Sequence, residues 1–436
     1  IRSTYFKNIM LKFLNTKNYK NLSSGKISLS QLNIFIGSNG SGKSNFINCL
    51  KFLKNCLTTT DDNRGVSSFE DAVTELGRER ILDITVDSPA KVKLAYCFAN
   101  SDSDSSLKKS SKVLDFKLDI VRQGAISTIA EEALYSGEEL QEIREDSPFY
   151  YYRFHDREIG KGVVSVYDNP ESTQTHFETF YNIRNEVFGL GAIYRLLEDS
   201  KFSPEMTPIY RVQREIFEEI KQWQFYNANN MNLQKIRNSE PKIGPNDRYL
   251  SSEGDNLPLV LDNLSQDIDF EDNINIAMRS ILPTTRRIRA ARSGRLSLTV
   301  EWYFEGTNEP FYLSEMSDGT VRMLCWAIIL HSPFLPSLLV IDEPELGLHV
   351  AWMRILAEWI KKAANRTQII VTTHSPDLLD HFTDSIENVF CFSLENSTHF
   401  SVHSLSPQKL QPQLEEGWEL GDLYRVGDPI IGGWPW

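Results

Sequence analysis

The segment Gly37–Ser44 reads GSNGSGKS, and it has the residue types and the spacing of a loop that binds phosphates. It follows the apolar stretch Leu32–Ile36 and precedes an amphipathic stretch of helical period. Glycines let backbone N–H groups curl around a polyphosphate, and a helix start adds partial positive charge. Lys43 would then reach the β- and γ-phosphates, and the Ser44 hydroxyl would bind Mg²⁺. The alternative is a glycine-rich turn that holds a lysine by chance. The nucleotide contacts predicted are Gly37, Ser38, Asn39, Gly40, Ser41, Gly42, Lys43, Ser44 and Asn45.

Two adjacent carboxylates, Asp342 and Glu343, end the apolar segment Leu338–Ile341, which is predicted to be a buried strand. At that place Asp342 could hold the Mg²⁺ shell, and Glu343 could polarise the water that attacks a γ-phosphate. Pro344 makes the chain leave the sheet sharply. The alternative is a strand that ends in a solvated acidic turn.

His374 follows a second predicted buried strand, Gln368–Thr372. A neutral imidazole at a strand end could donate a hydrogen bond to the γ-phosphate or position the attacking water. The alternative is a histidine with a purely structural role. We predict that Glu343, His374 and Lys43 carry the catalysis.

The polar segment Ser317–Thr320 precedes the predicted helix Val321–His331. A polar, glycine-containing helix start is a second anion site in principle. The alternative is a helix cap formed by Ser317 or Asp318, with nothing bound.

The composition restricts the class of protein. The 436 residues leave room for two or three folding units, and 41% hydrophobic with 24% charged residues is typical of a soluble globular chain. A net charge of −13 excludes a protein that merely coats nucleic acid. Five scattered cysteines without a CxxC pair argue against a disulfide framework and a zinc site. No stretch long enough to span a membrane and no signal peptide is recognisable, so we expect a cytoplasmic protein without a membrane partner.

Strands and helices alternate along both ends of the chain, which predicts an α/β fold with a mostly parallel sheet. Between these ends, residues 126–170 favour strands, 176–225 favour helices, 227–256 form an asparagine-rich loop region and 257–282 are helical. The polar run 100–112 is predicted to be a hairpin loop between two strands.

Taken together, GSNGSGKS, SDGT, LLVIDEPE and THSPDLLD resemble the motifs of the ABC-type ATPase superfamily, in its RecF, SMC and OLD-like branch. The resemblance covers roughly residues 10–125 and 285–395. It implies that these motifs are the Walker A, signature, Walker B and His-switch, and that Glu345–His349 is the D-loop. Ser317 and Gly319 would be signature contacts, although Asp318 stands where the family has a glycine. No glutamine can be assigned to the Q-loop.

The resemblance also implies a mechanism and its cofactors, ATP and Mg²⁺. Two protomers would clamp two ATP molecules head to tail, with each signature meeting the phosphate loop of its mate, in a homodimer or a higher oligomer. After His374 only 436 − 374 = 62 residues remain, too few for the TOPRIM nuclease of OLD-type proteins. The chain therefore resembles the ATPase subunits of bacterial anti-phage modules such as Septu and PARIS, which act with a separate effector, here expected to be a nuclease.

The predicted fold is an ABC-type, RecF/SMC-head-like P-loop ATPase head assembled from both ends of the chain. Its lobes are residues 1–125 and 283–400, with a mixed β and helical insertion at 126–282 and a Trp-rich tail at 401–436. The leading function is a sensor or scaffold ATPase of an anti-phage complex. The alternative is a RecF-like ATPase of DNA repair that binds duplex DNA. An ATP-binding module without turnover is disfavoured because Glu343 and His374 are both present.

Two further features leave several interpretations open. The segment Arg286–Arg295 holds five arginines and could contact DNA, an acidic partner, or nearby acids of the same chain such as Glu271. The tail carries Trp418, Trp434 and Trp436, which could dock on the protein itself or on a partner.

The substitution Lys43→Ala is expected to abolish ATP binding, because it removes the cation that meets the β- and γ-phosphates. Isothermal titration with ATP measures the effect directly. An unchanged nucleotide affinity would show that Gly37–Ser44 is not the phosphate loop.

Overall fold

The structure is a computed structural model that describes residues 9–22, 25–58, 67–77, 80–86, 90–100, 113–123, 126–137, 149–156, 160–169, 174–198, 203–244, 247–396 and 398–432. Residues 101–112 of the predicted hairpin loop 100–112 lie outside these ranges. In the part of the chain that is described, no helix combines the length and the apolar character of a membrane span.

The chain forms two compact units. Unit 1 comprises Ile1–Ser30, Asn39–Trp223 and Phe392–His403, and unit 2 comprises Gln31–Ser38, Gln224–Cys391 and Ser404–Trp436. Both predicted lobes, 1–125 and 283–400, contribute residues to each unit, and no unit boundary falls at residues 125–126. The four-part division of the chain stays a prediction.

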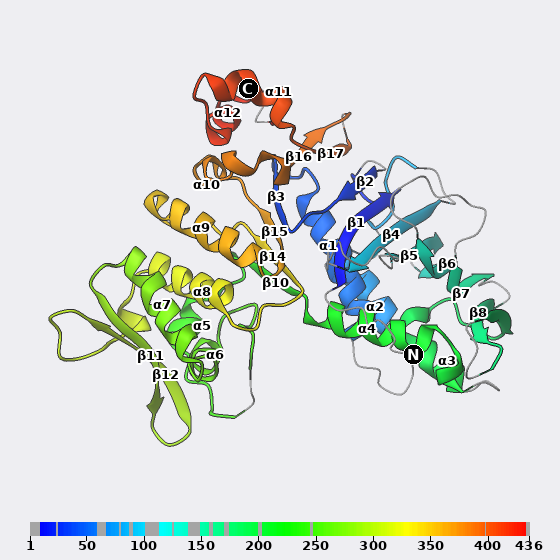
Figure 1. The fold of residues 1–436 in the computed structure, drawn as a ribbon, viewed down its shortest axis with the longest axis horizontal. Coiled ribbons are helices and arrows are strands. Elements are labelled where there is room, and N and C mark those ends of the chain that lie inside the picture. Colours follow the sequence, from blue (N-terminus) through cyan, green and yellow to red (C-terminus); the bar gives the residue numbers. More distant parts are fainter. Residues whose placement is uncertain are drawn as a thin grey trace. The chain divides into compact units, whose positions relative to one another are not determined.

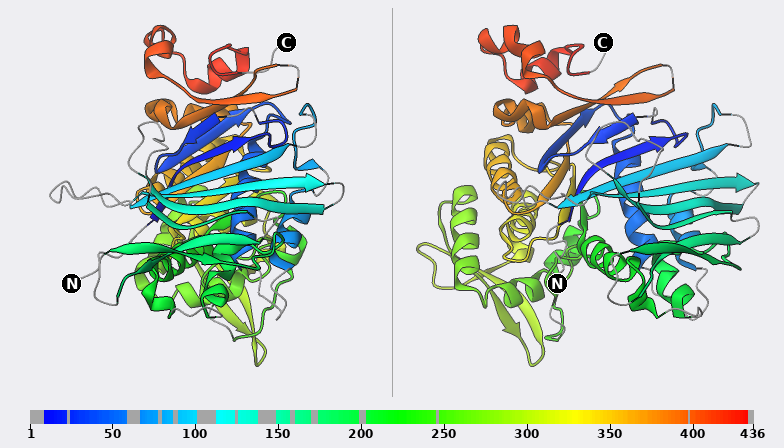
Figure 2. Two further views of the ribbon diagram at one scale, coloured as in Figure 1. Left: turned by 90° about the vertical axis from the view of Figure 1, so that its right-hand side faces the viewer. Right: turned by 45° about the vertical axis from the view of Figure 1, so that its right-hand side comes forward.

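Unit 1 is built on an eight-stranded antiparallel sheet with the strand order β2-β1-β4-β5-β6-β7-β8-β9. These strands lie side by side in Figure 2. In β4, Val92, Leu94 and Tyr96 are buried whereas Lys91 and Lys93 are exposed, the alternation expected of a strand that covers a core with one face. The bounds of the strands are β1 Ile9–Lys17, β2 Gly25–Ser28, β4 Lys91–Asn100, β5 Val113–Gln123, β6 Ile126–Gly137, β7 Phe149–Asp156, β8 Lys161–Tyr167 and β9 Thr175–Phe180.

Four helices of unit 1 accompany this sheet: α1 Lys43–Thr58, α2 Ser67–Glu75, α3 Gly189–Glu198 and α4 Ile209–Gln222. Helix α1 is fixed to β4 because the Tyr96 hydroxyl donates to the Cys49 carbonyl over 2.8 Å. It meets α2 through an edge-to-face contact of Phe52 with Phe69. The start of the phosphate loop's helix is thereby anchored to the sheet.

The expectation of helix from residue 176 is wrong for residues 176–180, which belong to the edge strand β9. These residues pair with β8 in antiparallel register, and this pairing supplies their backbone hydrogen bonds. The helices predicted for this region begin only at Gly189.

Unit 2 contains the parallel sheet predicted from the strand–helix alternation. Its order is β10-β14-β15-β3-β16, and β16 runs on past Cys391 into unit 1, where β17 follows it. All six residues of β3 are buried, which is typical of a central parallel strand. The bounds are β3 Leu32–Gly37, β10 Gln224–Asn227, β14 Leu338–Asp342, β15 Gln368–Thr372, β16 Val389–Leu394 and β17 Phe400–Ser404.

One hydrophobic core, which includes Trp302, Trp326 and Phe270, packs the helices of unit 2 with its parallel sheet and with the small antiparallel sheet β11-β12-β13. Figure 1 shows the helices of unit 2 and its small antiparallel sheet in green to red, and the strand β3 in blue. The bounds are α5 Leu233–Arg237, α6 Leu257–Leu264, α7 Ile268–Ile281, β11 Thr285–Ser293, β12 Ser297–Phe304, β13 Phe311–Tyr312, α8 Asp318–His331, α9 Met353–Ala364, α10 Pro376–Asp380, α11 Pro407–Glu415 and α12 Leu420–Val426.

The C-terminal tail docks on unit 2 itself. Leu410, Leu420, Leu423 and Ile431 are buried in the same core as the parallel sheet. Trp418 is 38% exposed, and Trp434 and Trp436 lie outside the described residues. Buried aliphatic side chains, and not Trp418, therefore hold the tail.

Candidate functional site

Three parallel strands of unit 2 end at one edge of the sheet and carry the predicted functional residues there. Phe35 of β3 pairs with Thr372 of β15, and Thr372 pairs with Asp342 of β14. The backbone N–H of Thr373 continues this alignment by donating to the Phe35 carbonyl over 3.0 Å. The first residues of the phosphate loop, the two acids and His374 consequently leave the sheet at the same edge.

The phosphate loop begins at this edge with Gly37 and continues past Ser38 into unit 1. Gly37, Gly40 and Gly42 have φ angles of 147°, 79° and 97°, in a region that favours glycine. A Cβ on Gly42 would also lie 2.5 Å from Leu22 Cδ2. Both the backbone conformation and the close packing therefore require glycine at position 42.

Side chains of unit 1 brace the loop from outside the motif. Asn21 donates its amide to the Gly40 carbonyl over 2.8 Å, and Asn45 donates to the Asn21 side-chain oxygen over 2.7 Å. The Lys43 ammonium is buried and donates to the Ser41 hydroxyl over 3.3 Å, whereas Ser44 is exposed. The sequence analysis did not single out Asn21, because it stands outside every motif.

Asp342 is held by a hydrogen bond on each carboxylate oxygen. The Thr372 hydroxyl donates to Oδ1, and the Asn227 amide donates to Oδ2 over 2.6 Å. A carboxylate has about four lone-pair sites, so each oxygen can still face a cation. This oxygen set fits Mg²⁺, which uses one or two protein oxygens together with the phosphates of a nucleotide. Ser44, the other predicted Mg²⁺ ligand, lies in the first turn of α1 in unit 1, and its side chain is exposed.

Glu343 adopts a left-handed backbone conformation with φ of 51°, which is rare for a residue other than glycine. Its backbone N–H is fixed by the carbonyl and the hydroxyl of Thr372, over 3.0 Å and 3.2 Å. The carboxylate lies 3.5 Å from His374 Nε2 and accepts from the Asn229 amide over 3.3 Å. The chain thus turns at Glu343 so that its side chain faces His374.

Glu345 connects the turn after β14 with the end of β15. Its Oε1 accepts hydrogen bonds from the Thr373 hydroxyl over 2.7 Å and from the His374 backbone N–H over 3.0 Å. Burial raises the pKa of this carboxyl, and the two bonds oppose that effect. Glu345 was expected only as part of a D-loop, and it proves to fix the backbone that carries His374.

Asn227 and Asn229 were missed by the sequence analysis, which assigned them to a loop region. They lie at the end of β10, a four-residue edge strand that pairs in parallel with β14, with Asn227 opposite Asp342. Four residues are too few to show a period. The signal that was available is the run of asparagines directly after an apolar pair.

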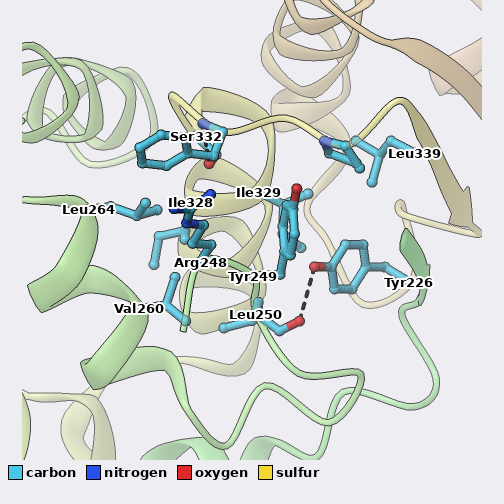
Figure 3. A pocket seen from close by; sticks show the side chains of 12 residues that line it. Tyr226, Arg248, Tyr249, Leu250, Val260, Leu264, Ile328, Ile329, Ser332 and Leu339 are labelled. Atoms are coloured by element: carbon cyan, nitrogen blue, oxygen red, sulfur yellow. Dashed lines mark hydrogen bonds between the residues drawn. The ribbon is translucent and has the colours of Figure 1, made fainter. Parts of the chain in front are cut away.

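A small pocket lies beside the strand β10, and Tyr226 of that strand is one of the residues that line it (Figure 3). Its enclosed volume of about 10 Å³ is near the lower limit for one water, so it is no ligand site of nucleotide size. Tyr226, next to Asn227, points its hydroxyl at the Leu250 carbonyl and donates to it over 3.0 Å. This hydrogen bond helps to hold β10, and with it the asparagines, next to the acids.

The predicted signature residues form the start of helix α8. The Ser317 side chain accepts from the Thr320 N–H and caps the helix, and a Cβ on Gly319 would lie 3.2 Å from the Gly347 carbonyl. Asp318 pairs with Arg237 over 2.5 Å. The geometry is that of the helix cap which the sequence analysis left open, and a role of Ser317 and Gly319 in binding nucleotide stays a prediction.

Comparison with known proteins identifies the family of this chain. A family model described as "AAA domain, putative AbiEii toxin, Type IV TA system" matches residues 32–380. The chain belongs to this family. The AAA-domain protein is an ATPase with an α/β fold, as the four motifs predicted.

Three proteins that are similar to this ATPase share only a small part of its sequence. The "Retron Vc95 probable ATPase" of Vibrio cholerae serotype O1 biovar El Tor is 22% identical over 409 residues, which cover 86% of this chain and 72% of that protein. An SMC head bound to the C-winged helix domain of ScpA is 14% identical, covering 92% and 99% of the two chains, with a TM-score of 0.49. The SMC head domain from Thermotoga maritima is 12% identical, with 91% and 99% coverage and a TM-score of 0.44.

The substitutions Asn227→Ala and Asn229→Ala are each expected to lower kcat about tenfold, since a hydrogen bond to a charged group contributes about 1.5–3 kcal/mol. KM for ATP should change little, because these amides contact the acids. Steady-state ATPase kinetics test this. The matched control is Asn263→Ala, which loses an amide bond to the Asp247 carbonyl. A wild-type kcat in both variants would remove the asparagines from the site.

Proposed function

We propose that this ATPase hydrolyses Mg²⁺-bound ATP at the sheet edge of unit 2, as the nucleotide-driven subunit of a bacterial anti-phage complex. One observation carries the proposal. Glu343 is held in a left-handed turn with its carboxylate 3.5 Å from His374, at the edge where the phosphate loop begins. A carboxylate fixed next to an imidazole at such an edge is suited to orient and deprotonate a water.

Each residue then has a distinct task. Glu343 accepts the proton of the attacking water, and His374 orients that water or donates to the γ-phosphate oxygen. Lys43 offsets the charge of the β- and γ-phosphates, while Asp342 and Ser44 hold Mg²⁺, which neutralises phosphate charge when bound. Asn227 and Asn229 keep the two acids apart and oriented by their separate hydrogen bonds.

Head-to-tail dimerisation around ATP is part of the proposal. The start of α8 offers a capped helix N-terminus at which Ser317 and Asp318 are exposed. The acid at position 318 would repel a phosphate, but the Arg237 guanidinium offsets its charge. This ion pair removes the main objection to a signature role for Ser317 and Gly319.

The defence role is supported by the relative named as a retron ATPase and by the family description, which names a toxin of a toxin–antitoxin system. We propose that a separate effector protein, a nuclease, acts together with the ATPase. ATP binding would close the dimer and hydrolysis would open it, so the nucleotide shifts a conformational equilibrium that the effector senses.

The substitution Glu343→Gln is expected to keep ATP binding, to lower kcat at least a hundredfold and to accumulate the dimer, because closure persists when the base is missing. Light scattering after size exclusion should give twice the mass of one chain with ATP, and one chain without it. Hydrolysis at the wild-type rate would exclude Glu343 as the base, and a monomer at saturating ATP would exclude the dimer.

Purification of the tagged protein from its native cells, followed by mass spectrometry, distinguishes the leading function from the alternative in DNA repair. A stoichiometric nuclease or toxin supports the anti-phage complex. A solitary protein whose ATPase activity rises with duplex DNA supports the RecF-like role.

One observation favours a DNA contact at the arginine cluster. Four of these arginines lie on strand β11 and Arg295 lies in the turn between β11 and β12, and the cluster divides into two groups. Arg287 pairs with Glu271 over 2.7 Å, and Arg289 pairs with Glu301 over 2.8 Å. Arg286, Arg292 and Arg295 are exposed and form no ion pair with described residues. The intramolecular pairing left open by the sequence therefore holds for two of the five arginines only.

A variant with Arg286, Arg292 and Arg295 changed to serine is expected to bind duplex DNA more weakly, with a salt dependence flattened by about three charges. The matched control changes Arg287 and Arg289, whose charges are already balanced by carboxylates. Fluorescence anisotropy at several salt concentrations compares them. Equal losses in both variants, or none in either, would assign the cluster a structural role.

A further inference from the structure

Residues 18–22, which follow β1 in unit 1, form a turn with a strained backbone. Asn18 and Lys20 adopt left-handed conformations with φ angles of 56° and 49°. The Leu22 N–H closes the turn by donating to the Tyr19 carbonyl over 3.2 Å. A left-handed lysine is rare, and strain of this kind persists only where the surrounding structure fixes the backbone. The contacts that fix this turn therefore indicate its role.

The phosphate loop packs on the last two residues of this turn. The Asn21 amide donates to the Gly40 carbonyl over 2.8 Å, and its side-chain oxygen accepts from Asn45 over 2.7 Å. Leu22 lies against Gly42, where a Cβ would come within 2.5 Å of the leucine Cδ2. One asparagine thus connects the loop with the first turn of α1. A shift of the turn would consequently move both.

Two other segments of unit 1 hold this turn at its two ends. The Asp83 N–H donates to the Asn18 carbonyl over 3.1 Å. At the start of β17, the Phe400 N–H donates to the Asn21 carbonyl over 2.9 Å. Phe400 also forms an isolated parallel bridge with Leu22. The position of Asn21 therefore depends on β17, which is far away in the sequence.

A contact between side chains joins these two segments to each other. His399 Nε2 lies 2.5 Å from Asp83 Oδ2, and the two side chains are only 13% and 9% exposed. Asp83 Oδ1 accepts from the N–H and from the hydroxyl of Thr85, each over 2.8 Å. Burial raises the pKa of the Asp83 carboxyl, but its hydrogen bonds with Thr85 and His399 bring it below its ordinary value. The contacts around the turn form a closed chain through Asn21, Phe400, His399, Asp83 and Asn18.

We propose that Asn21 is a positioning residue of the phosphate loop, and that the contact of His399 with Asp83 fixes Asn21 from the far side of the turn. The inference rests on ATP binding at the loop 37–44, and it names residues outside that loop which set the affinity. Asn21 acts through the Gly40 carbonyl, and His399 acts through the turn. By thermodynamic reciprocity, a nucleotide that orders the loop also stabilises residues 399–403.

Asn21→Ala removes both side-chain bonds and keeps the backbone contacts of the turn. The dissociation constant for a non-hydrolysable ATP analogue, measured by isothermal titration, is expected to rise about tenfold, as for the loss of two hydrogen bonds. His399→Ala should raise it about threefold, because it loosens one side of the closed chain. The matched control is His403→Ala on the same strand, which loses a contact of 3.5 Å with Ser393 and should bind as wild type does.

The double variant distinguishes positioning from a general loss of stability. If His399 acts through Asn21, His399→Ala should have almost no further effect on affinity once Asn21 is alanine. Two independent effects would instead multiply to about thirtyfold. Effects that multiply, or wild-type affinity in Asn21→Ala, would overturn the inference.

Hydrogen exchange provides a readout that a merely structural asparagine would not change. In the wild type, the analogue should slow amide exchange in residues 399–403, and in Asn21→Ala this nucleotide-dependent difference should disappear. Unchanged exchange in the wild type with the analogue bound would contradict the coupling. If the wild type bound no analogue in the titration, the proposed ATP site itself would fail, so the two failures are distinguishable.

Discussion

The candidate site depends on one residue that belongs to none of its predicted groups. Thr372, the last residue of β15, is fully buried, and its hydroxyl and carbonyl together hold both acids of β14. The hydroxyl donates to Asp342 Oδ1 and accepts from the Glu343 N–H, which the Thr372 carbonyl also accepts. These bonds exist only because β14 and β15 are parallel and in register, so that Thr372 lies opposite Asp342. A shift of one residue would turn the hydroxyl to the other face.

Around this threonine, neighbouring strand ends supply side chains to the same edge of the sheet. Asn227 and Asn229 approach the acids from β10, and Glu345 connects the β14 turn to the backbone of His374. Helix α8 joins the arrangement because Arg322 donates to the Ala228 carbonyl, between the two asparagines. A displacement at the start of α8 therefore acts on the residues that orient the acids, which would connect the proposed dimer contact with the proposed hydrolytic groups.

Residues in continuous motifs were predictable from the sequence, and their supporting residues were not. Strands β3, β14 and β15 are short apolar runs that end in polar residues, so their bounds and the acids that follow them could be predicted almost to the residue. Asn21 and Thr372 act through tertiary contacts, and nothing in their local sequence distinguishes them, while only a run of asparagines after an apolar pair marks Asn227. The edge strand β9 was predicted as helix because pairing with β8, and not local propensity, decides its conformation.

The left-handed backbone of Glu343 has a consequence for how substitutions at this position would be tolerated. A side chain other than glycine in this conformation costs about 1 kcal/mol or more of folding free energy. Glycine would relieve that strain and leave the turn intact, so a chain selected for stability would be expected to lose its acid here. With Glu343 in its proposed role as the base, folding stability and turnover make opposite demands on this residue. The single substitution Glu343→Gly would therefore give a more stable protein whose sheet edge lacks the proposed base.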